Sequence, residues 1–233
     1  MGRAEDLPGM EPSLAATPTQ LLDVAERLFA NQGIDNVSIR EIVRASGQSN
    51  LSAAHYHFGS REAMVGALLA RRIRAINVIR HQRLDALEAA ARDNTIHAIV
   101  GVTIGALGEV VKSTSWGRDH VRVAAQVILS PNNDVQAFLD PDTMSGQIRC
   151  TAMLRRLLPQ LRPQVFKDRI WILNNEATYS MARWINAHGP VTASNGRRFG
   201  VLLRNTADFL AAGLAAPVGE PATEDELDAE TSL

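Results

Sequence analysis

Apolar residues recur at the spacing of amphipathic helices from about residue 19 to residue 216 of this 233-residue chain. The apolar face of the first such segment, 19–31, is formed by Leu21, Ala25, Leu28 and Phe29. Sustained alternation of apolar and polar residues, which is typical of strands, does not occur, and aromatic residues make up only 5% of the chain. The pattern therefore predicts an all-α protein.

Capping residues mark the ends of the first two helices. Gly33 predicts a left-handed turn that ends the first helix. Ser38, followed three residues later by Glu41, predicts a capping box at the start of the second helix. Gly47 then permits a tight turn, which ends the second helix near residue 46.

Seven more helices are predicted after this turn, about nine in all. The third is short, about 50–57, and Gly59 breaks the chain after it. Ser60 can cap a long fourth helix, 61–91. The remaining helices are expected at 95–113, 117–129, 145–158, 164–188 and 196–214.

Two short helices joined by a glycine-containing turn, after an amphipathic helix, form a unit whose last helix can enter the major groove of DNA. A groove-facing helix requires small polar groups and no carboxylates. The segment 48–57 contains neither Asp nor Glu and offers amide, hydroxyl, imidazole and phenol groups. The pattern thus favours a DNA-binding function.

The formal net charge of −1 conceals an uneven distribution. Six acidic residues and no basic ones lie between Pro217 and Leu233, so the rest of the chain carries +5. A mildly basic body is compatible with DNA contact but does not establish it. The N-terminus lacks a signal-peptide pattern, and no run approaches the roughly 18 consecutive apolar residues that span a bilayer. We expect a cytoplasmic protein with no membrane partner.

Catalytic and metal-binding patterns are absent from the sequence. It has no G-x-S-x-G, no P-loop and no H-E-x-x-H, so no enzyme and no cofactor is predicted. The single cysteine, Cys150, excludes an intramolecular disulfide. The pair His55 and His57 lacks further metal-ligand types nearby, so no metal site is expected.

The segment from Leu21 to Leu69 resembles the DNA-binding domain of TetR-type transcription regulators. The resemblance rests on Phe29, Gly33, the runs S-I-R-E-I (38–42) and A-S-G (45–47), and Y-H-F-G-S-R-E (56–62). It implies a helix-turn-helix domain followed by a helical bundle that binds an effector and dimerises. The expected organisation is a flexible arm (1–17), a DNA-binding domain (18–75), an effector-binding and dimerisation domain (76–215) and a disordered acidic tail (216–233).

The resemblance also implies which residues contact DNA. The sequence departs from the family pattern by one extra residue between Gly47 and Tyr56, and by arginine where the family has lysine at position 61. The expected DNA-binding residues are Ser38, Arg40, Gln48, Ser49, Asn50, Ser52, His55, Tyr56, His57 and Arg61. Taken singly, histidines such as His55 and His57 are more often helix-end or core residues than DNA contacts.

The C-terminal half leaves several alternatives open. Apolar stripes within 164–188 and 199–214 are either core or dimer interface. Arginines along the fourth helix form either a phosphate track or, as we expect, a solvated face; these are Arg71, Arg72, Arg74, Arg80 and Arg83. The candidate effector-pocket residues, unless they are ordinary buried polar groups, are Trp116, His120, Asn174, Asn175 and Tyr179.

The sequence as a whole favours a repressor that binds a palindromic double-stranded DNA operator as a homodimer. A single recognition helix contacts few base pairs, and two copies supply the two half-sites. The resemblance implies a small-molecule effector that releases the operator, and the abundant aliphatic residues in the C-terminal half predict that this effector is mainly apolar. The alternatives are an activator of the same fold, or a helical ligand-binding or scaffolding protein whose helix-turn-helix is architectural.

Overall fold

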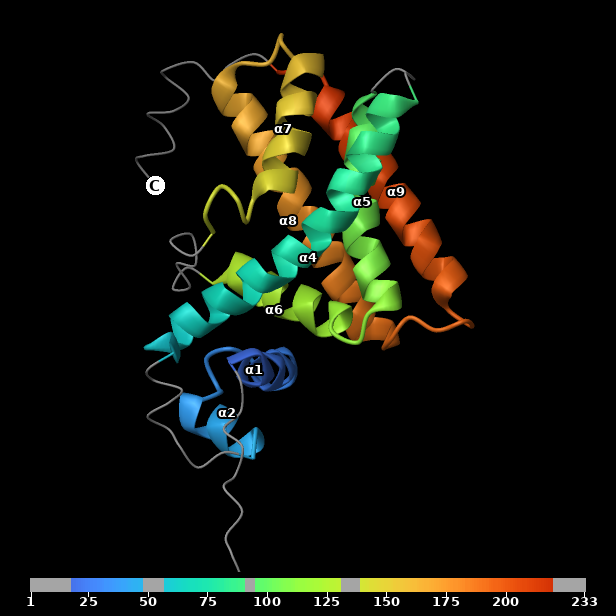
Figure 1. Cartoon of the computed structure of the whole chain (residues 1–233). Coiled ribbons are helices and arrows are strands. Elements are labelled where there is room, and N and C mark those ends of the chain that lie inside the picture. The colour runs from blue at the N-terminus through green and yellow to red at the C-terminus, as the bar shows by residue number, and fades with distance from the viewer. Residues whose placement is uncertain (1–17, 48–56, 91–94, 131–138, 220–233) are drawn as a thin grey trace, which may run out of the picture.

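The computed structural model describes residues 18–47, 57–90, 95–130 and 139–219. Regular structure within these ranges is entirely helical (Figure 1), which confirms the all-α prediction. The helices are α1 (Pro18–Gln32), α2 (Ile39–Ala45), α4 (Arg61–Ala89), α5 (Ile96–Ser113), α6 (Gly117–Leu129), α7 (Ser145–Leu157), α8 (Pro163–His188) and α9 (Gly196–Ala215).

The predicted serine N-caps of α2 and α4 and the left-handed glycine that ends α1 are confirmed. The Ser38 hydroxyl accepts a hydrogen bond from the Glu41 amide at 3.1 Å and caps α2. Ser60 caps α4 in the same way through the Ala63 amide, also at 3.1 Å. Gly33 has φ +95° where α1 ends, a conformation that glycine adopts without steric cost. The predicted third helix, about 50–57, lies outside the described residues except for its last position.

Helices α1 and α2 and the first turns of α4 pack around one hydrophobic cluster. Its most deeply buried members include Phe29, Ile42 and Met64, with no more than a trace of exposed surface. Val123 of α6 is also fully buried in this cluster. The N-terminal unit therefore completes its core with a side chain from the C-terminal half of the chain.

The C-terminal half is a helical bundle with α5 at its centre. Helix α5 contacts α4, α6, α7, α8 and α9 (Figure 1). By length and composition α5 is apolar enough to cross a membrane, but 56% of it is buried inside the bundle. Burial on several sides explains this composition, since a helix at the centre of a bundle needs no wide polar face.

Helix α4 belongs to both units. Leu68 and Leu69, near its start, lie in the N-terminal cluster, whereas Ile76 and Leu84 lie in the larger C-terminal cluster. Arg72 and Arg80 lie on the same buried side and are only 6% and 7% exposed. The expectation that the arginines of this helix form a solvated face is therefore wrong at these two positions.

The apolar stripes of α8 and α9 belong mainly to the core. Leu173 and Met181 of α8 and Phe199 and Leu210 of α9 are buried in the C-terminal cluster. The structure thereby settles an alternative that the sequence left open. A different set of apolar side chains on these two helices faces outward.

Gly117 allows α6 to begin in contact with the last turns of α5. A Cβ atom at this position would lie 2.1 Å from the Val110 carbonyl oxygen and 2.4 Å from its carbon. Backbone atoms cannot rotate away as a flexible side chain can. By contrast, a Cβ atom at Gly101, within α5, would meet nothing within 4 Å.

These two glycines give opposite predictions. We expect Gly117→Ala to lower the free energy of unfolding by about 1–3 kcal/mol, because α5 and α6 must separate. Gly101→Ala is expected to raise it by about 0.5–1 kcal/mol, because alanine costs less backbone entropy in a helix. Urea denaturation of both variants measures the difference. Equal stabilities would contradict the close approach of α5 and α6.

Candidate nucleic-acid interface and cavity

The described part of the predicted DNA-binding surface consists of α2 and the residues around it. The Ser38 side chain is engaged in capping α2. Arg40 is exposed, and so is Arg44, four residues later and therefore on the same side of the helix. Sequence analysis did not select Arg44, although its spacing from Arg40 was a usable signal.

The predicted base-reading residues cannot all be placed. Gln48, Ser49, Asn50, Ser52, His55 and Tyr56 lie outside the described residues. His57 is exposed, and its ring centroid lies 6.3 Å from that of Phe58. Phe58 packs against the N-terminal cluster, in keeping with a structural role for this aromatic residue.

Arg61 has a structural contact in addition to its predicted phosphate contact. Its Nη1 donates a hydrogen bond to the Asp35 carbonyl oxygen at 3.0 Å, and its Nη2 lies 3.5 Å from the Asp35 carboxylate. The guanidinium thus ties the start of α4 to the turn between α1 and α2. A DNA phosphate would compete with the Asp35 carboxylate for this cation.

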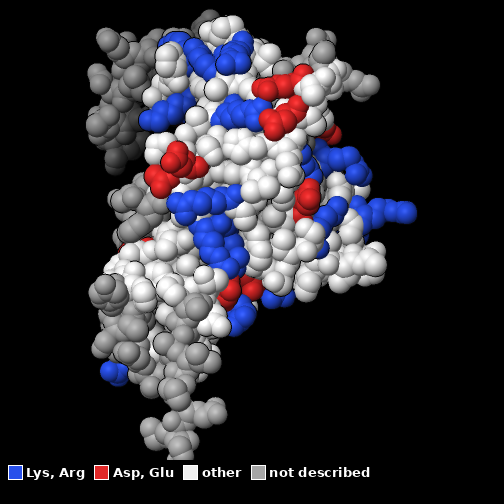
Figure 2. Space-filling view, viewed as in Figure 1, with Lys and Arg blue, Asp and Glu red and all other residues white. Residues whose placement is uncertain are grey.

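Charge alone does not mark a DNA-binding surface on the face of the molecule that Figure 2 shows. Figure 2 shows lysine and arginine side chains gathered mainly over the C-terminal bundle, interspersed with acidic side chains. The described part of the N-terminal unit shows few charged atoms in this view. The assignment of the interface therefore depends on the helix-turn-helix pattern.

The α1–α6 junction connects the two units through the side chain of Gln126. Its Oε1 accepts a hydrogen bond from the Ile34 amide at 2.8 Å, and its Nε2 donates to the Phe29 carbonyl at 3.0 Å and to the Arg122 carbonyl at 3.3 Å. Arg122 in turn donates to Asn31 Oδ1 at 2.8 Å. Gln126 therefore satisfies backbone groups at the turn that ends α1.

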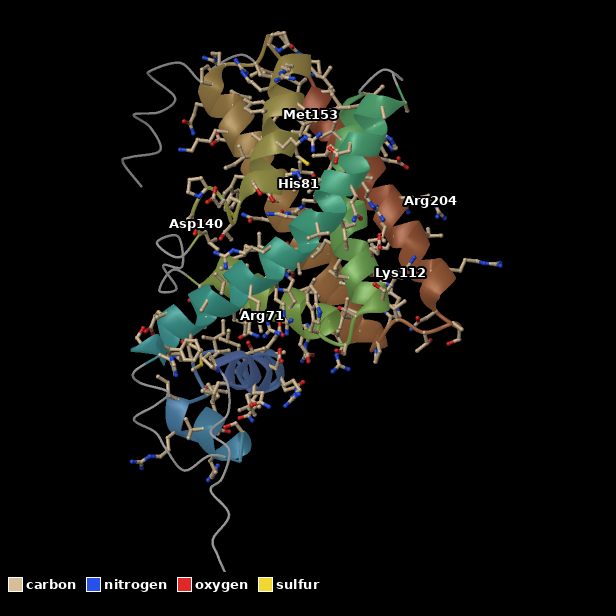
Figure 3. The ribbon with its side chains drawn as sticks, viewed as in Figure 1. Arg71, His81, Lys112, Asp140, Met153 and Arg204 are labelled. Atoms are coloured by element: carbon tan, nitrogen blue, oxygen red, sulfur yellow. The ribbon has the colours of Figure 1, made fainter. Side chains whose placement is uncertain are left out.

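A buried ion pair between Glu26 and Arg72 joins α1 to α4. Arg72 forms hydrogen bonds to both carboxylate oxygens of Glu26 and, at 2.7 Å, to Asp23. The Arg72 guanidinium also lies over the Trp116 ring, 4.5 Å from its centroid. Burial raises the pKa of Glu26, and Arg72 opposes that rise. Neighbouring Arg71, labelled in Figure 3, pairs with Asp23 at 2.9 Å.

A cavity of about 310 Å³ lies between α4, α5, α6, α7 and α8. Its walls are mainly aliphatic and include Leu107, Ile128 and Leu139. This volume is at the lower end of the range of about 300–1,000 Å³ that is typical of small-molecule sites. The polar side chains that line it are Arg80, Thr103, His120, Gln147, Asn174, Asn175 and Thr178.

Three of the five predicted effector residues line this cavity, namely His120, Asn174 and Asn175. Trp116 lies outside it, edge-on to His120 with ring centroids 5.9 Å apart. Tyr179 also lies outside, because five residues after Asn174 its side chain has turned about 140° around α8. Trp116 and Tyr179 thus do not line this cavity, and their assignment to an effector pocket stays a prediction.

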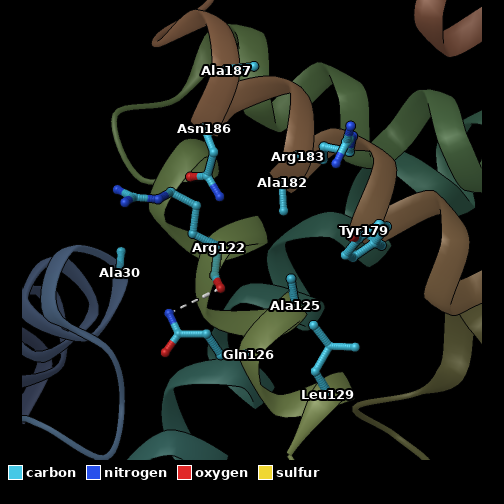
Figure 4. A pocket seen from close by; sticks show the side chains of 10 residues that line it. All are labelled: Ala30, Arg122, Ala125, Gln126, Leu129, Tyr179, Ala182, Arg183, Asn186 and Ala187. Carbon is cyan, nitrogen blue, oxygen red and sulfur yellow. Dashed lines mark hydrogen bonds between the residues drawn. The ribbon is translucent and has the colours of Figure 1, made fainter.

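Tyr179 instead lines a wider cleft of about 590 Å³ between α1, α6 and α8 (Figure 4). Half of its ten lining side chains are exposed, among them Leu129 at 68%, Arg183 and Asn186. The cavity contains one such residue, Trp171, at 64%. Enclosure therefore favours the cavity over the cleft as a site for a small apolar molecule.

Sequence analysis missed Arg80 as a cavity residue. A signal was available, since Leu68, Arg72, Ile76, Arg80 and Leu84 follow one another at intervals of four. Residues at this spacing share one side of a helix. The buried neighbours thus indicate that both arginines point toward the core.

Comparison with known proteins agrees with the architecture. Residues 21–68 match the family described as bacterial regulatory proteins, tetR family. The matched residues coincide with the predicted helix-turn-helix segment, which is therefore similar to the DNA-binding domain of that family. A search of curated protein sequences finds no match.

Solved TetR-type structures share the fold over most of the chain. A putative TetR family regulator from Shewanella sp. PV-4 is 14% identical, with a TM-score of 0.61, and the match covers 83% of this chain and 95% of that one. FadR from Bacillus subtilis, in complex with stearoyl-CoA, is 10% identical, with a TM-score of 0.57 and coverage of 84% and 99%. A TetR-family regulator from Bordetella parapertussis 12822 is 17% identical, with a TM-score of 0.54 and coverage of 88% and 97%.

Gln126 gives a testable prediction for the junction. We expect Gln126→Ala to lower the free energy of unfolding by about 1–2 kcal/mol and to speed hydrogen exchange of the Ile34 amide, which loses its acceptor. Gln126→Glu keeps that acceptor but cannot donate to Phe29, so Ile34 should remain protected. Gln164→Ala, which removes only a surface contact to Asp168, is the control. Unchanged protection of the Ile34 amide in Gln126→Ala would show that the Gln126 side chain is not its hydrogen-bond acceptor.

His120 gives a prediction for pH dependence. Burial, reinforced by Arg72 and Arg80, lowers the pKa of His120 to about 3. In the unfolded chain this histidine titrates near its ordinary pKa of about 6.5, so stability is lost as the pH falls from that value toward 3. Between pH 7 and pH 5 the loss should be about 2 kcal/mol.

The measurement is urea denaturation at both pH values. His120→Gln should reduce the loss between pH 7 and pH 5, whereas Gln164→Ala, at an exposed residue that does not titrate, should leave it unchanged. The same pH dependence in wild type and His120→Gln would show that His120 is not the titrating group.

Proposed function

We propose that this chain is a TetR-type regulator, a homodimeric transcriptional repressor that a small, mainly apolar effector releases from a palindromic operator. DNA is read by residues 18–75, and the effector is bound mainly by residues 76–215, in a cavity to which Leu69 and Ile73 also contribute. The two hydrophobic clusters, which meet along α4, support this division. The acidic tail and the N-terminal arm have no part in the proposal.

The observation that carries the proposal is the double role of α6. Val123 and Gln126 join α6 to the N-terminal unit. One residue away on the same helix, Ala124 and Val127 line the cavity, as does His120. A molecule that fills the cavity would therefore contact α6, the helix against which α1 packs.

The effector acts by population shift. Two arrangements of α6 and α1 exist in equilibrium, and only one spaces the recognition helices of the dimer to match successive major grooves. An effector that binds the other arrangement more tightly weakens operator binding, and the operator weakens effector binding by the same factor. The FadR structure from Bacillus subtilis is a complex with stearoyl-CoA, so a protein of this fold binds a molecule that carries a long apolar acyl chain on a charged headgroup.

Exposed apolar side chains on α8 and α9 support dimerisation through these helices. Trp171, Ile172 and Tyr179 of α8 are 40–64% exposed, and Val201 and Phe209 of α9 are 43% and 73% exposed. These five make up half of the large apolar side chains exposed in the described ranges. A second copy of the chain would remove them from water.

DNA binding is tested by fluorescence anisotropy with the DNA that flanks the protein's own gene. Wild type should bind tightly, and Arg40→Ala and Tyr56→Ala should bind at least about tenfold more weakly. If each Arg40 of a dimer contacts one phosphate, Arg40→Ala should also reduce the slope of log affinity against log salt by about two.

Arg156→Ala is the matched control, since Arg156 is exposed near the end of α7 and carries the same charge. Equal losses in Arg156→Ala and Arg40→Ala would indicate a general charge effect and contradict the interface. Failure of wild type to bind this DNA in preference to unrelated DNA would favour an architectural helix-turn-helix, or an operator elsewhere that a random-sequence selection would find.

Dimerisation is tested by sedimentation of Phe209→Glu. A carboxylate on this exposed position of α9 should dissociate the dimer, because it would be buried without a counter-charge. Val78→Glu, at a 58% exposed position on α4, should remain dimeric. A monomeric wild type, or a dimer that Phe209→Glu leaves intact, would remove α9 from the proposed interface.

A further inference from the structure

Arg80 is the one residue of the cavity, among those the structure describes, that carries a permanent charge away from water. It is 7% exposed and lines the cavity from α4. Its Nη1 donates a hydrogen bond to Asn77 Oδ1 at 3.0 Å. No carboxylate among the described residues forms an ion pair with it, in contrast to Arg72, which pairs with Glu26.

Unpartnered polar atoms concentrate around the same cavity. Four buried side-chain nitrogen or oxygen atoms in the described ranges lack a hydrogen-bond partner. Two of them, Arg80 Nε and His120 Nδ1, belong to residues that line the cavity. A third, the Thr143 hydroxyl, belongs to the residue whose carbonyl oxygen accepts from Asn77, the partner of Arg80.

Cys150 does not supply the missing counter-charge. It is buried close enough to Arg80 to interact with it electrostatically. Burial raises the pKa of the Cys150 thiol above its ordinary value, so the group is neutral near pH 7. The guanidinium consequently remains without an anion in the described structure.

A buried cation without a counter-ion destabilises the folded state, and buried charges in proteins are ordinarily paired. An unpaired guanidinium in the wall of a ligand-sized cavity therefore indicates that the ligand supplies the anion. Arginine presents parallel N–H donors that match the two oxygens of a carboxylate. One cation beside a neutral His120 balances a single negative charge better than a doubly charged phosphate.

We propose that the cavity binds an apolar carboxylic acid whose carboxylate pairs with Arg80. The apolar body of the acid lies against the aliphatic walls that include Leu107 and Ile128. His120, which is neutral, has a ring nitrogen left to hydrogen-bond the carboxylate in the appropriate tautomer. The inference rests on the proposed effector role of the cavity and specifies the chemical class of the effector.

The test uses carboxylic acids and their uncharged counterparts as probes. Hexanoate, octanoate, decanoate and 4-phenylbutyrate are compared with the corresponding primary alcohols by calorimetry and thermal denaturation of the full-length protein. At least one acid should bind wild type about tenfold or more tightly than its alcohol, because the buried pair adds a charge-assisted contact. Arg80→Met should remove this preference, whereas Arg156→Met should retain it.

Three outcomes would overturn the inference: alcohols that bind wild type as well as the acids, a preference for acids that survives in Arg80→Met, or no binding by any acid of the set. The stability of unliganded Arg80→Met is a second readout. Its melting temperature should equal or exceed that of wild type, since the variant removes an uncompensated buried charge. A melting temperature more than about 5 °C below that of wild type would show that other groups of the unliganded protein already stabilise the charge of Arg80.

Neither readout requires DNA, so this inference and the proposed function can fail separately. Acids that bind through Arg80 without changing DNA affinity would preserve the site and refute effector release. Specific DNA binding by a protein that binds none of the acids would preserve the regulator and refute the anion site.

Discussion

Helix α6 is packed into both hydrophobic cores at once, and the arrangement of the two halves depends on that contact. Val123 is buried with α1 and α2, while Val121, two residues earlier, is buried in the C-terminal cluster. Gln126 adds directional bonds to the end of α1. Packed interiors tolerate little displacement. A movement of α6 at the cavity wall would therefore also displace the α6 side chains that pack against α1. This constraint gives a ligand in the cavity a physical route to the DNA-binding unit.

Much of the fold could be predicted because its signals are local. Ser38 and Ser60 cap helices, and Gly33 and Gly47 adopt the left-handed conformation that the sequence indicated. Such signals depend on neighbours within four residues. Assigning the stripes of α8 and α9 to core or interface required knowledge of which helices pack on them, which helical periodicity does not contain.

The candidate site was less predictable, because a cavity is defined by helices far apart in sequence. Asn174 and Asn175 were selected as polar residues on an otherwise apolar helix, and His120 was a further polar candidate elsewhere in the chain. All three line one cavity. Tyr179 met the same criterion as the asparagines but lies on another side of α8. Arg80 was assigned to solvent because its charge outweighed its position between Ile76 and Leu84. The DNA-reading residues remain a prediction from resemblance.

Selection from random-sequence DNA with the full-length protein tests the central claim, sequence-specific DNA reading by a dimer, without assuming where the operator lies. The account predicts enrichment of an inverted repeat whose half-sites are spaced by about one helical turn or a multiple of it. Enrichment should be lost when the same selection is performed with Tyr56→Ala. Failure to enrich any sequence with wild type, or enrichment of one that Tyr56→Ala binds equally well, would contradict it.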